Sequence, residues 1–486
     1  MSISSNTSTA TSSHTPITIS SPSGRLPIEL LSEIFLQCVD EKMDEQNTIH
    51  IPLLLSSVCS RWRDAAINSH RLWSRLSIQL SGETPNSLTS LVDTWLFRSG
   101  ECPLTIYVFW EESQDDPPFQ DSHPVLDKLM AHSERWKTMF FYLPFCAFNS
   151  FASVRNRLPM LTDLSLGTDD DVSLPSPQNQ YNMFEFAPRL RSLECINFSP
   201  TILQFPWAQL RDIPVVSGDI EDCLDILNRA NHLSKIGVIF VGGSPITWST
   251  TPPSPATLTH YPFITHNHLT ELSIMTPPWN EVVDLAALFP RLTLPHLEKL
   301  TICNLHSTFG PEFTSFLSRL PNLKTLHLRK TALPDDQLVE GLKHLSSLTS
   351  LIVLSSPGTT RASNAAHIAA ANGVVETEPT VTRYLLEALT RNFFSNDAMD
   401  GMLLPHLRRL ELTVSSTAAR ELDTFIDMLQ SRLRDDVGLA RLEHVSLRPC
   451  VDMANDFMIR LIELRDLGLE VVVKDMDQIQ ERIQPF

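Results

Sequence analysis

The sequence predicts an α/β solenoid, in which a small three-helix domain precedes an irregular arc of parallel strands and intervening helices. A six-residue pattern, L-x-x-L-x-L, recurs from about residue 136 onward. Segments with one apolar helical face lie between its copies, and three short apolar segments precede them. We therefore expect a tail over 1–24, a helical domain over 25–80, a connecting helix and strand over 81–135, and repeats over 136–486.

The composition indicates a folded chain that is a poor candidate for binding nucleic acid or anionic membranes. Of its 486 residues, 42% are hydrophobic, which is enough to bury a large core. A net charge of −18 leaves no surplus of cations, so we expect neither nucleic-acid nor membrane-surface binding. No apolar run reaches the about 18 residues of a membrane span. The eight cysteines are scattered without a CxxC pair, which favours buried thiols in a reducing compartment, the cytoplasm or the nucleus.

The tail is expected to be disordered. Residues 1–24 contain 14 serines or threonines and no charged residue. Such a segment cannot bury enough apolar surface to offset the entropy of ordering. It also lacks the basic start and the apolar stretch of a secretory signal.

Three short helices are expected in the helical domain. The first, over 27–39, opens at Pro27, and the second, over 51–69, opens at Pro52. The third is expected over 70–80. The apolar faces consist of Leu30, Leu31, Ile34, Phe35, Cys38 and Val39 in the first helix, and of Leu54, Leu55, Val58, Cys59 and Trp62 in the second. A bundle this small has little core of its own and usually depends on a partner or on the rest of the chain.

The connecting segment predicts one helix and one strand. Apolar residues from Leu88 to Trp95 are spaced i, i+3, i+4, i+7, and Gly100 can end that helix in the left-handed region. Alternating apolar residues over 104–108 then predict a strand.

The repeats are regular in pattern and irregular in length. Copies start at Leu161, Leu190, Leu210, Leu233, Leu269, Leu297, Leu323, Leu348, Leu407 and Leu442, and the copy at Leu210 is weak. Most spacings lie near the 20–29 residues of a leucine-rich repeat. The ninth position lacks the asparagine that regular repeats use along the turn. We therefore expect an uneven arc with insertions at 111–124, 167–181, 241–265 and 355–380.

No motif predicts catalysis, a cofactor or a metal. The nucleotide-binding, zinc-protease and hydrolase signatures are absent. His266 and His268 share a strand-like face, where zinc is conceivable, but no third ligand is evident and a loop is favoured. The consecutive Asp169, Asp170 and Asp171 lack the glycine and glutamate of a calcium loop. We therefore do not expect this protein to be an enzyme.

The N-terminal residues resemble a known family. The Leu-Pro opening, the Leu-Leu-x-x-Ile-Phe face, the Val-Cys-x-x-Trp-Arg block and the closing Leu-Trp are similar to an F-box, over about residues 25–78. The next block, up to about 108, and the looser repeats resemble the F-box-like proteins of mushroom-type fungi. The resemblance implies a substrate adaptor of an SCF-type cullin–RING ubiquitin ligase, whose F-box binds the Skp adaptor and whose repeats bind the target.

The resemblance also assigns residues to the Skp-facing surface. In the first helical region these are Leu26, Pro27, Ile28, Leu30 and Ile34. In the second they are Val58, Cys59 and Trp62, which fit either the interface or the bundle core.

A second surface is expected on the repeats. Positions three, five and seven of L-x-x-L-x-L-x alternate with buried leucines and line the concave face. In four C-terminal repeats the cations and histidines at these positions are Lys299, His327, Arg329, Arg409, His444 and Arg448. Either they form an ordinary solvated face, or they bind an acidic or phosphorylated segment of the target.

The leading hypothesis is therefore an adaptor that brings a target lysine close to a charged ubiquitin-conjugating enzyme, a proximity effect. The alternative is a leucine-rich-repeat scaffold or signalling protein that does not work through ubiquitin. The identity of the target is not encoded in any pattern that we recognise.

Overall fold

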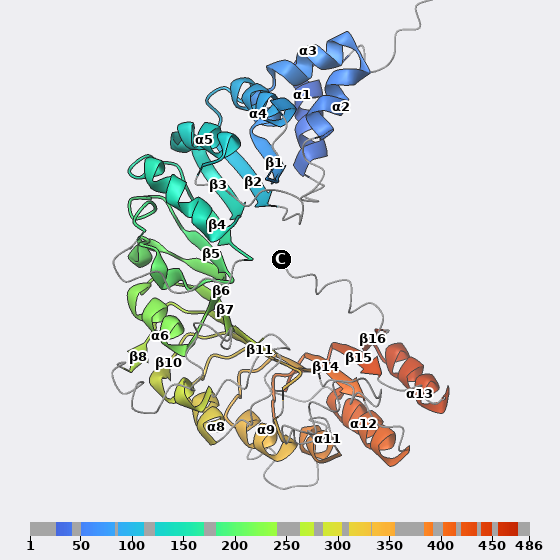
Figure 1. Ribbon diagram of the computed structural model, residues 1–486. Coiled ribbons are helices and arrows are strands. Elements are labelled where there is room, and N and C mark those ends of the chain that lie inside the picture. The colour runs from blue at the N-terminus through green and yellow to red at the C-terminus, as the bar shows by residue number, and fades with distance from the viewer. Residues whose placement is uncertain are drawn as a thin grey trace, which may run out of the picture. The chain divides into compact units, whose positions relative to one another are not determined.

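The structure, a computed structural model, describes residues 26–40, 50–82, 86–110, 122–169, 181–240, 263–276, 285–303, 311–331, 333–354, 383–391, 402–414, 419–434, 439–449 and 455–474 (Figure 1). The chain forms two compact units. The first reaches Gln79 and includes Thr84–Tyr107, and the second contains Leu80–Glu83 and all residues from Val108 onward. The predicted tail over 1–24 lies outside the described residues, as do most of the predicted insertions.

The first unit is mainly helical. Its elements are α1 (Ile28–Asp40), α2 (His50–Val58), α3 (Ser60–Asn68), the 3₁₀ turn η2 (His70–Trp73), β1 (Arg75–Leu80) and α4 (Asn86–Arg98), and β2 (Leu104–Trp110) crosses into the second unit. The helix expected over 51–69 is two helices, because Cys59 adopts an extended backbone at φ −159°. The third expected helix, over 70–80, is wrong. Leu76, Ile78 and Leu80 alternate with polar residues, and this two-residue period forms a strand.

Two tryptophans organise the first unit. The Trp73 indole donates to the Ala66 carbonyl at 2.7 Å and meets the Trp95 ring edge-on at 4.7 Å. The Arg98 guanidinium lies 4.4 Å from the centre of the Trp73 ring, a cation–π distance. As predicted, Gly100 ends α4 with φ +54°. These contacts join η2 to the C-terminal turns of α3 and α4.

The second unit is built on one parallel sheet, as the sequence predicts. Its strands, in spatial order, are β3 (Trp136–Tyr142), β4 (Asp163–Gly167), β5 (Ser192–Ile196), β6 (Asp212–Gly218), β7 (Lys235–Phe240), β9 (Glu271–Met275), β11 (Lys299–Cys303), β12 (Thr325–Arg329), β13 (Ser350–Leu354), β14 (Arg409–Val414), β15 (His444–Pro449) and β16 (Glu470–Val473). Each of the ten predicted repeats begins two residues before one of these strands. The repeat prediction is therefore confirmed strand by strand, and only β3 and β16 lack the pattern.

Helices cover one face of this sheet. They are α5 (Pro124–Ala131), α6 (Ile220–Arg229), α8 (Pro311–Leu317), α9 (Asp335–Leu342), α11 (Arg383–Leu389), α12 (Ala419–Arg432) and α13 (Asn455–Asp466), with 3₁₀ turns such as η4 (Phe145–Val154) in the other connections. Figure 1 shows the labelled helices from α6 to α13 on the same side of the strands. A short separate sheet pairs β8 (Ile264–Thr265) with β10 (Leu292–Thr293).

The core is a ladder of leucines and their equivalents. In register, one row contains Leu272, Leu300, Leu326, Leu351, Leu410 and Val445, and the next contains Ile274, Ile302, Leu328, Val353, Leu412 and Leu447. All twelve side chains are buried. Because alternate strand residues point to opposite faces, the intervening positions lie on the other side of the sheet.

The arc is irregular, as the missing asparagine ladder predicts. The register shifts on both sides of β6, between Ser192 and Cys195 and between Ile213 and Val216. One asparagine does serve a turn: Asn197 has φ +64°, and its Nδ2 donates to the Thr168 carbonyl at 3.1 Å.

Two expectations from composition can be compared with the structure. The described cysteines are all free thiols, but only Cys195, Cys223 and Cys303 are buried, so the expectation of buried thiols is wrong for the others. Cys38 and Cys59 are exposed because they lie on a small bundle. Among the described residues, no helix combines the length and the apolar character needed to cross a membrane.

A buried arginine bonds to the end of α11 and to the residues shortly before β14. Arg432, at the end of α12, is 1% exposed. Its guanidinium donates to the carbonyls of Leu389, Leu403 and Leu404 at 2.7, 2.8 and 3.1 Å. Burial, together with the charge of Arg391, lowers the pKa of Arg432 to about 9, so the group is still cationic at neutral pH. One helix-end carbonyl and two loop carbonyls are thus satisfied by one side chain.

We expect Arg432→Met to lower the free energy of unfolding of the second unit by roughly 3 kcal/mol, because three buried carbonyls lose their donor. Urea denaturation followed by circular dichroism measures this loss. Arg408→Met is the control, because Arg408 is exposed and its ion pair with Glu443 contributes at most about 1 kcal/mol. Equal, small losses in both variants would contradict a structural role for Arg432.

Candidate functional site

Helix α1 carries an exposed apolar strip. Leu31 and Phe35 point into the bundle and are 2% and 1% exposed. Leu30 and Ile34, four residues apart, are 53% and 47% exposed, and Pro27 continues their row. Pro27, Leu30 and Ile34 were assigned to the Skp-facing surface, and all three are exposed in the structure.

Helix α2 adds apolar side chains that sequence reasoning missed. Leu53 and Leu54 are 41% and 64% exposed, although Leu54 was expected in the core, and only Leu55 is buried. Val58, one turn after Leu54 and already assigned to the Skp-facing surface, is 56% exposed. The signal was the run of three leucines, since consecutive residues spread over more than half of a helix circumference and cannot all face one core.

The other residues assigned to this surface have mixed surroundings. Trp62 is half-buried and packs against the core residue Phe35, with ring centres 5.0 Å apart. Cys59 is exposed at the break between α2 and α3. Leu26 is half-buried, and its carbonyl accepts a hydrogen bond from Arg61 of α3. Trp62 therefore supports the bundle, whereas Cys59 lies at its surface.

We call the exposed residues Ile28, Leu30, Ile34, Leu53, Leu54 and Val58 the apolar surface of the first unit. The described residues expose fifteen large hydrophobic side chains, and these are six of them, within a segment of about thirty residues. Such a concentration makes this surface a candidate for protein interaction, because scattered single exposures are the norm. Apolar side chains on helices offer contact area to a protein, but no chemistry for catalysis.

On the second unit, the expected target-binding residues lie on the face opposite the helices. Arg409 of β14 and His444 of β15 are in register, and Lys299 of β11 lies in the same row. His327 of β12 belongs to the next row, and Arg329 and Arg448 to the one after it. The sheet thus gathers residues that are up to about 150 positions apart in the sequence, as parallel pairing requires.

Carboxylates on the same face lie within ion-pair distance of three of these six residues. Glu411 pairs with Arg448 at 2.7 Å and with Lys474 at 3.3 Å. Glu470 lies 3.0 Å from the His444 ring, and Glu271 lies 3.5 Å from the ammonium of Lys299. Burial disfavours the ionised form of Glu411, but Arg448 and Lys474 outweigh it and keep the pKa of its carboxyl below the usual value. Three of the six expected residues are therefore used within the sheet.

The remaining three residues, His327, Arg329 and Arg409, differ in charge and in solvent exposure. His327 is half-buried, its Nε2 has no hydrogen-bond partner among the described residues, and burial lowers the pKa of its ring, so it is neutral at pH 7. Arg329 is half-buried and Arg409 is exposed. Neither arginine makes an ion pair or side-chain hydrogen bond within the described part of the chain. Among the six expected residues, these two arginines are the cations that make no ion pair with a described residue.

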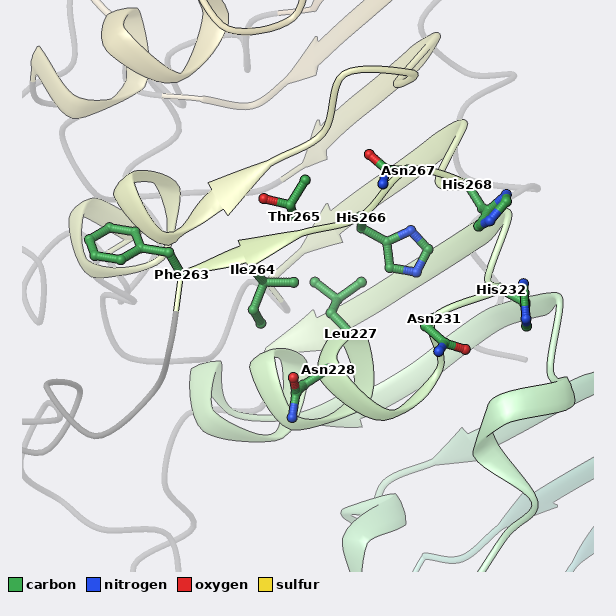
Figure 2. A pocket seen from close by; sticks show the side chains of 10 residues that line it. All are labelled: Leu227, Asn228, Asn231, His232, Phe263, Ile264, Thr265, His266, Asn267 and His268. Atoms are coloured by element: carbon green, nitrogen blue, oxygen red, sulfur yellow. The ribbon is translucent and has the colours of Figure 1, made fainter.

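The paired histidines belong to a polar cleft of about 440 Å³ beside α6 and β8, shown in Figure 2. The His266 side chain is buried and both ring nitrogens are occupied: Nε2 lies 2.9 Å from the Ala230 carbonyl, and Nδ1 accepts from the Leu269 amide at 3.1 Å. His268 faces His232 instead, with ring centres 5.2 Å apart. His266 is thus a structural residue, and the described residues contain no cluster of three metal-ligating side chains. The zinc alternative gains no support.

Comparison with known proteins gives no sequence match and only a weak structural similarity. No protein-family model matches the chain, and no curated protein sequence matches it. Among solved structures, a chain of the complex of Rad7 and Elc1 in yeast is similar at a TM-score of 0.38 and 12% identity, over 94% of each chain. At this level the likeness does not extend to a function.

We expect Glu411→Gln to lower the free energy of unfolding at pH 7 by about 2 kcal/mol, because Arg448 is left part-buried without its counterion. The pKa of Glu411 is lowered by folding, so its contribution is complete above its ordinary pKa of 4.5 and is lost as the pH falls through the lower value. Urea titrations at pH 7 and pH 3 measure this difference.

The control is Glu470→Gln, because Glu470 is 70% exposed and its pairing with His444 is solvated. It should change stability little at either pH. A deficit of Glu411→Gln that is equally large at pH 3 would contradict the charge-based explanation.

Proposed function

We propose that this chain is the substrate-recognition adaptor of an SCF-type cullin–RING ubiquitin ligase. Its first unit acts as an F-box that binds the Skp adaptor, and its repeats hold the target protein. The chain itself is no enzyme in this proposal: it concentrates the target near a ubiquitin-charged enzyme bound elsewhere in the assembly.

The apolar surface of the first unit carries the proposal. The F-box-like pattern assigns Leu30 and Ile34 to the Skp interface, and the folded chain leaves both about half exposed. An isolated helical domain that exposes leucines in place of burying them gains stability when a partner covers them. The long parallel sheet supports the second half of the proposal, since one face is covered by helices and the other offers polar and charged side chains.

We expect Leu30→Asp to weaken binding of the Skp adaptor at least about thirtyfold, the loss typical of a truncated or charged hot-spot residue. Because Leu30 is 53% exposed in the free chain, the variant should keep its melting temperature within a few degrees. Isothermal titration of the purified adaptor against the full chain measures the affinity.

The matched control is Ile459→Asp on α13, where the side chain is 55% exposed and lies in the other unit. This variant should bind the adaptor as tightly as the unchanged chain. If Leu30→Asp also binds normally, the chain is better explained as a repeat scaffold that does not work through ubiquitin.

On the target side, we expect charge reversal of Arg329 and Arg409 together to weaken an acidic ligand about tenfold at low salt, with a smaller effect at high salt. A fluorescent peptide with two phosphoserines flanked by glutamates is a suitable probe, because arginine binds phosphate in bidentate fashion. Lys324→Glu, which reverses an exposed cation that already pairs with Glu298, is the control. Identical affinity and salt dependence in the double variant would show that the two arginines are ordinary surface.

A further inference from the structure

Aromatic rings gather on the first strands of the second unit, on the face opposite the described helices. Met139 and Phe141 of β3 are buried, and Phe141 packs against Phe151 of η4 with ring centres 4.9 Å apart. Phe140 and Tyr142 alternate with them, so they lie on the other face of the sheet. Both are half-buried.

A third ring extends the row. Phe109 of β2 is half-buried and lies 5.0 Å from Phe140, centre to centre. Phe140 and Tyr142 are 6.5 Å apart with planes only 10° from parallel. We call Phe109, Phe140 and Tyr142 the aromatic row. Three neighbouring rings on one sheet face provide contact area. Their side chains lose little conformational entropy on binding, because each has only two rotatable bonds.

The last ring of the row is held in place before any partner arrives. The Tyr142 hydroxyl donates to Asp169 Oδ1 at 2.6 Å, and Asn197 Nδ2 donates to the same hydroxyl at 3.2 Å. A Cβ at Gly167 would lie 2.4 Å from the Tyr142 ring, so only glycine lets the ring lie over β4. Burial, followed by the bond to Asp169, raises the pKa of Tyr142, which keeps the phenol protonated.

Carboxylates border the aromatic row. In register, the solvent-face positions of β3, β4 and β5 are Thr138, Phe140, Tyr142, Asp163, Ser165, Gly167, Ser192, Glu194 and Ile196. These nine positions contain two carboxylates and no cation. The Asp163 carboxylate accepts from the hydroxyls of Thr162 at 2.6 Å and Thr138 at 3.4 Å, and it makes no ion pair with a described residue. No described cation therefore pairs with Asp163 at this face.

We propose that the aromatic row, with Asp163 and Glu194, is a binding site for an arginine-bearing segment of another protein. Aromatic faces attract cations, and neighbouring carboxylates add both charge and hydrogen-bond acceptors. Arginine fits better than lysine, because its planar guanidinium stacks on a ring and presents a fork of donors to a carboxylate. This site prefers the opposite charge to the arginines of β12 and β14, and it does not depend on the adaptor role.

The test uses the full chain and two synthetic peptides, Gly-Ser-Gly-Arg-Gly-Arg-Ser-Gly and the same peptide with citrulline in place of arginine. Citrulline keeps the planar shape but lacks the charge. We expect the arginine peptide to bind about tenfold more tightly at low salt, and the difference to shrink as salt increases. Fluorescence anisotropy of labelled peptides measures both affinities without altering the protein.

Variants then locate the site. Phe140→Leu, and Asp163→Asn combined with Glu194→Gln, should each weaken the arginine peptide roughly three- to tenfold. Glu340→Gln, which removes an exposed carboxylate from α9, should leave its affinity unchanged. Equal binding of the two peptides, tighter binding of a proline-rich peptide of the same length, or an unchanged affinity in the folded Asp163→Asn, Glu194→Gln variant would overturn the proposal.

Discussion

The two-residue alternation of the repeat strands is the constraint on which the second unit depends. Leucines at two fixed positions of every repeat stack in register from β9 to β15 and require helices on that face to keep water out. The positions between them are thereby fixed on the opposite face, where burial is not required. Aromatic and acidic residues occupy that face on β3 to β5, and arginines such as Arg329 and Arg409 occupy it later in the chain. One alternation thus provides both the core and a face on which polar, charged and aromatic side chains can lie.

The first unit follows a different principle. A domain of this size cannot enclose all of its apolar residues, and α1 and α2 divide theirs between a core face and a solvent face. Leu31 and Leu55 are buried, while Leu30 and Leu54, one position earlier in each helix, are exposed. Trp73 and Trp95 are among the largest side chains buried in this unit. A partner that covers the exposed leucines would complete the hydrophobic burial that the bundle begins.

The sequence predicted the structure correctly where one residue type recurs at a fixed spacing and has the same role in each repeat. The leucine pattern located ten strands to within two residues, since those positions have one role in every repeat. It failed where the structure depends on contacts between residues that are far apart in the sequence. The pairing of Glu411 with Arg448 joins residues 37 positions apart, and the bonds of Arg432 reach back as far as 43 positions to Leu389. The exposure of Leu54 was also missed, because an apolar residue within a helical pattern is normally assigned to the core.

The central claim is that a partner covers the apolar surface of α1 and α2. Hydrogen exchange of the full chain, measured with and without the purified Skp adaptor, tests it without any substitution. The account predicts slower amide exchange over 28–62 when the adaptor is present, and no change in β9 to β15. Unchanged exchange over 28–62 at saturating adaptor, or protection confined to the repeats, would contradict it.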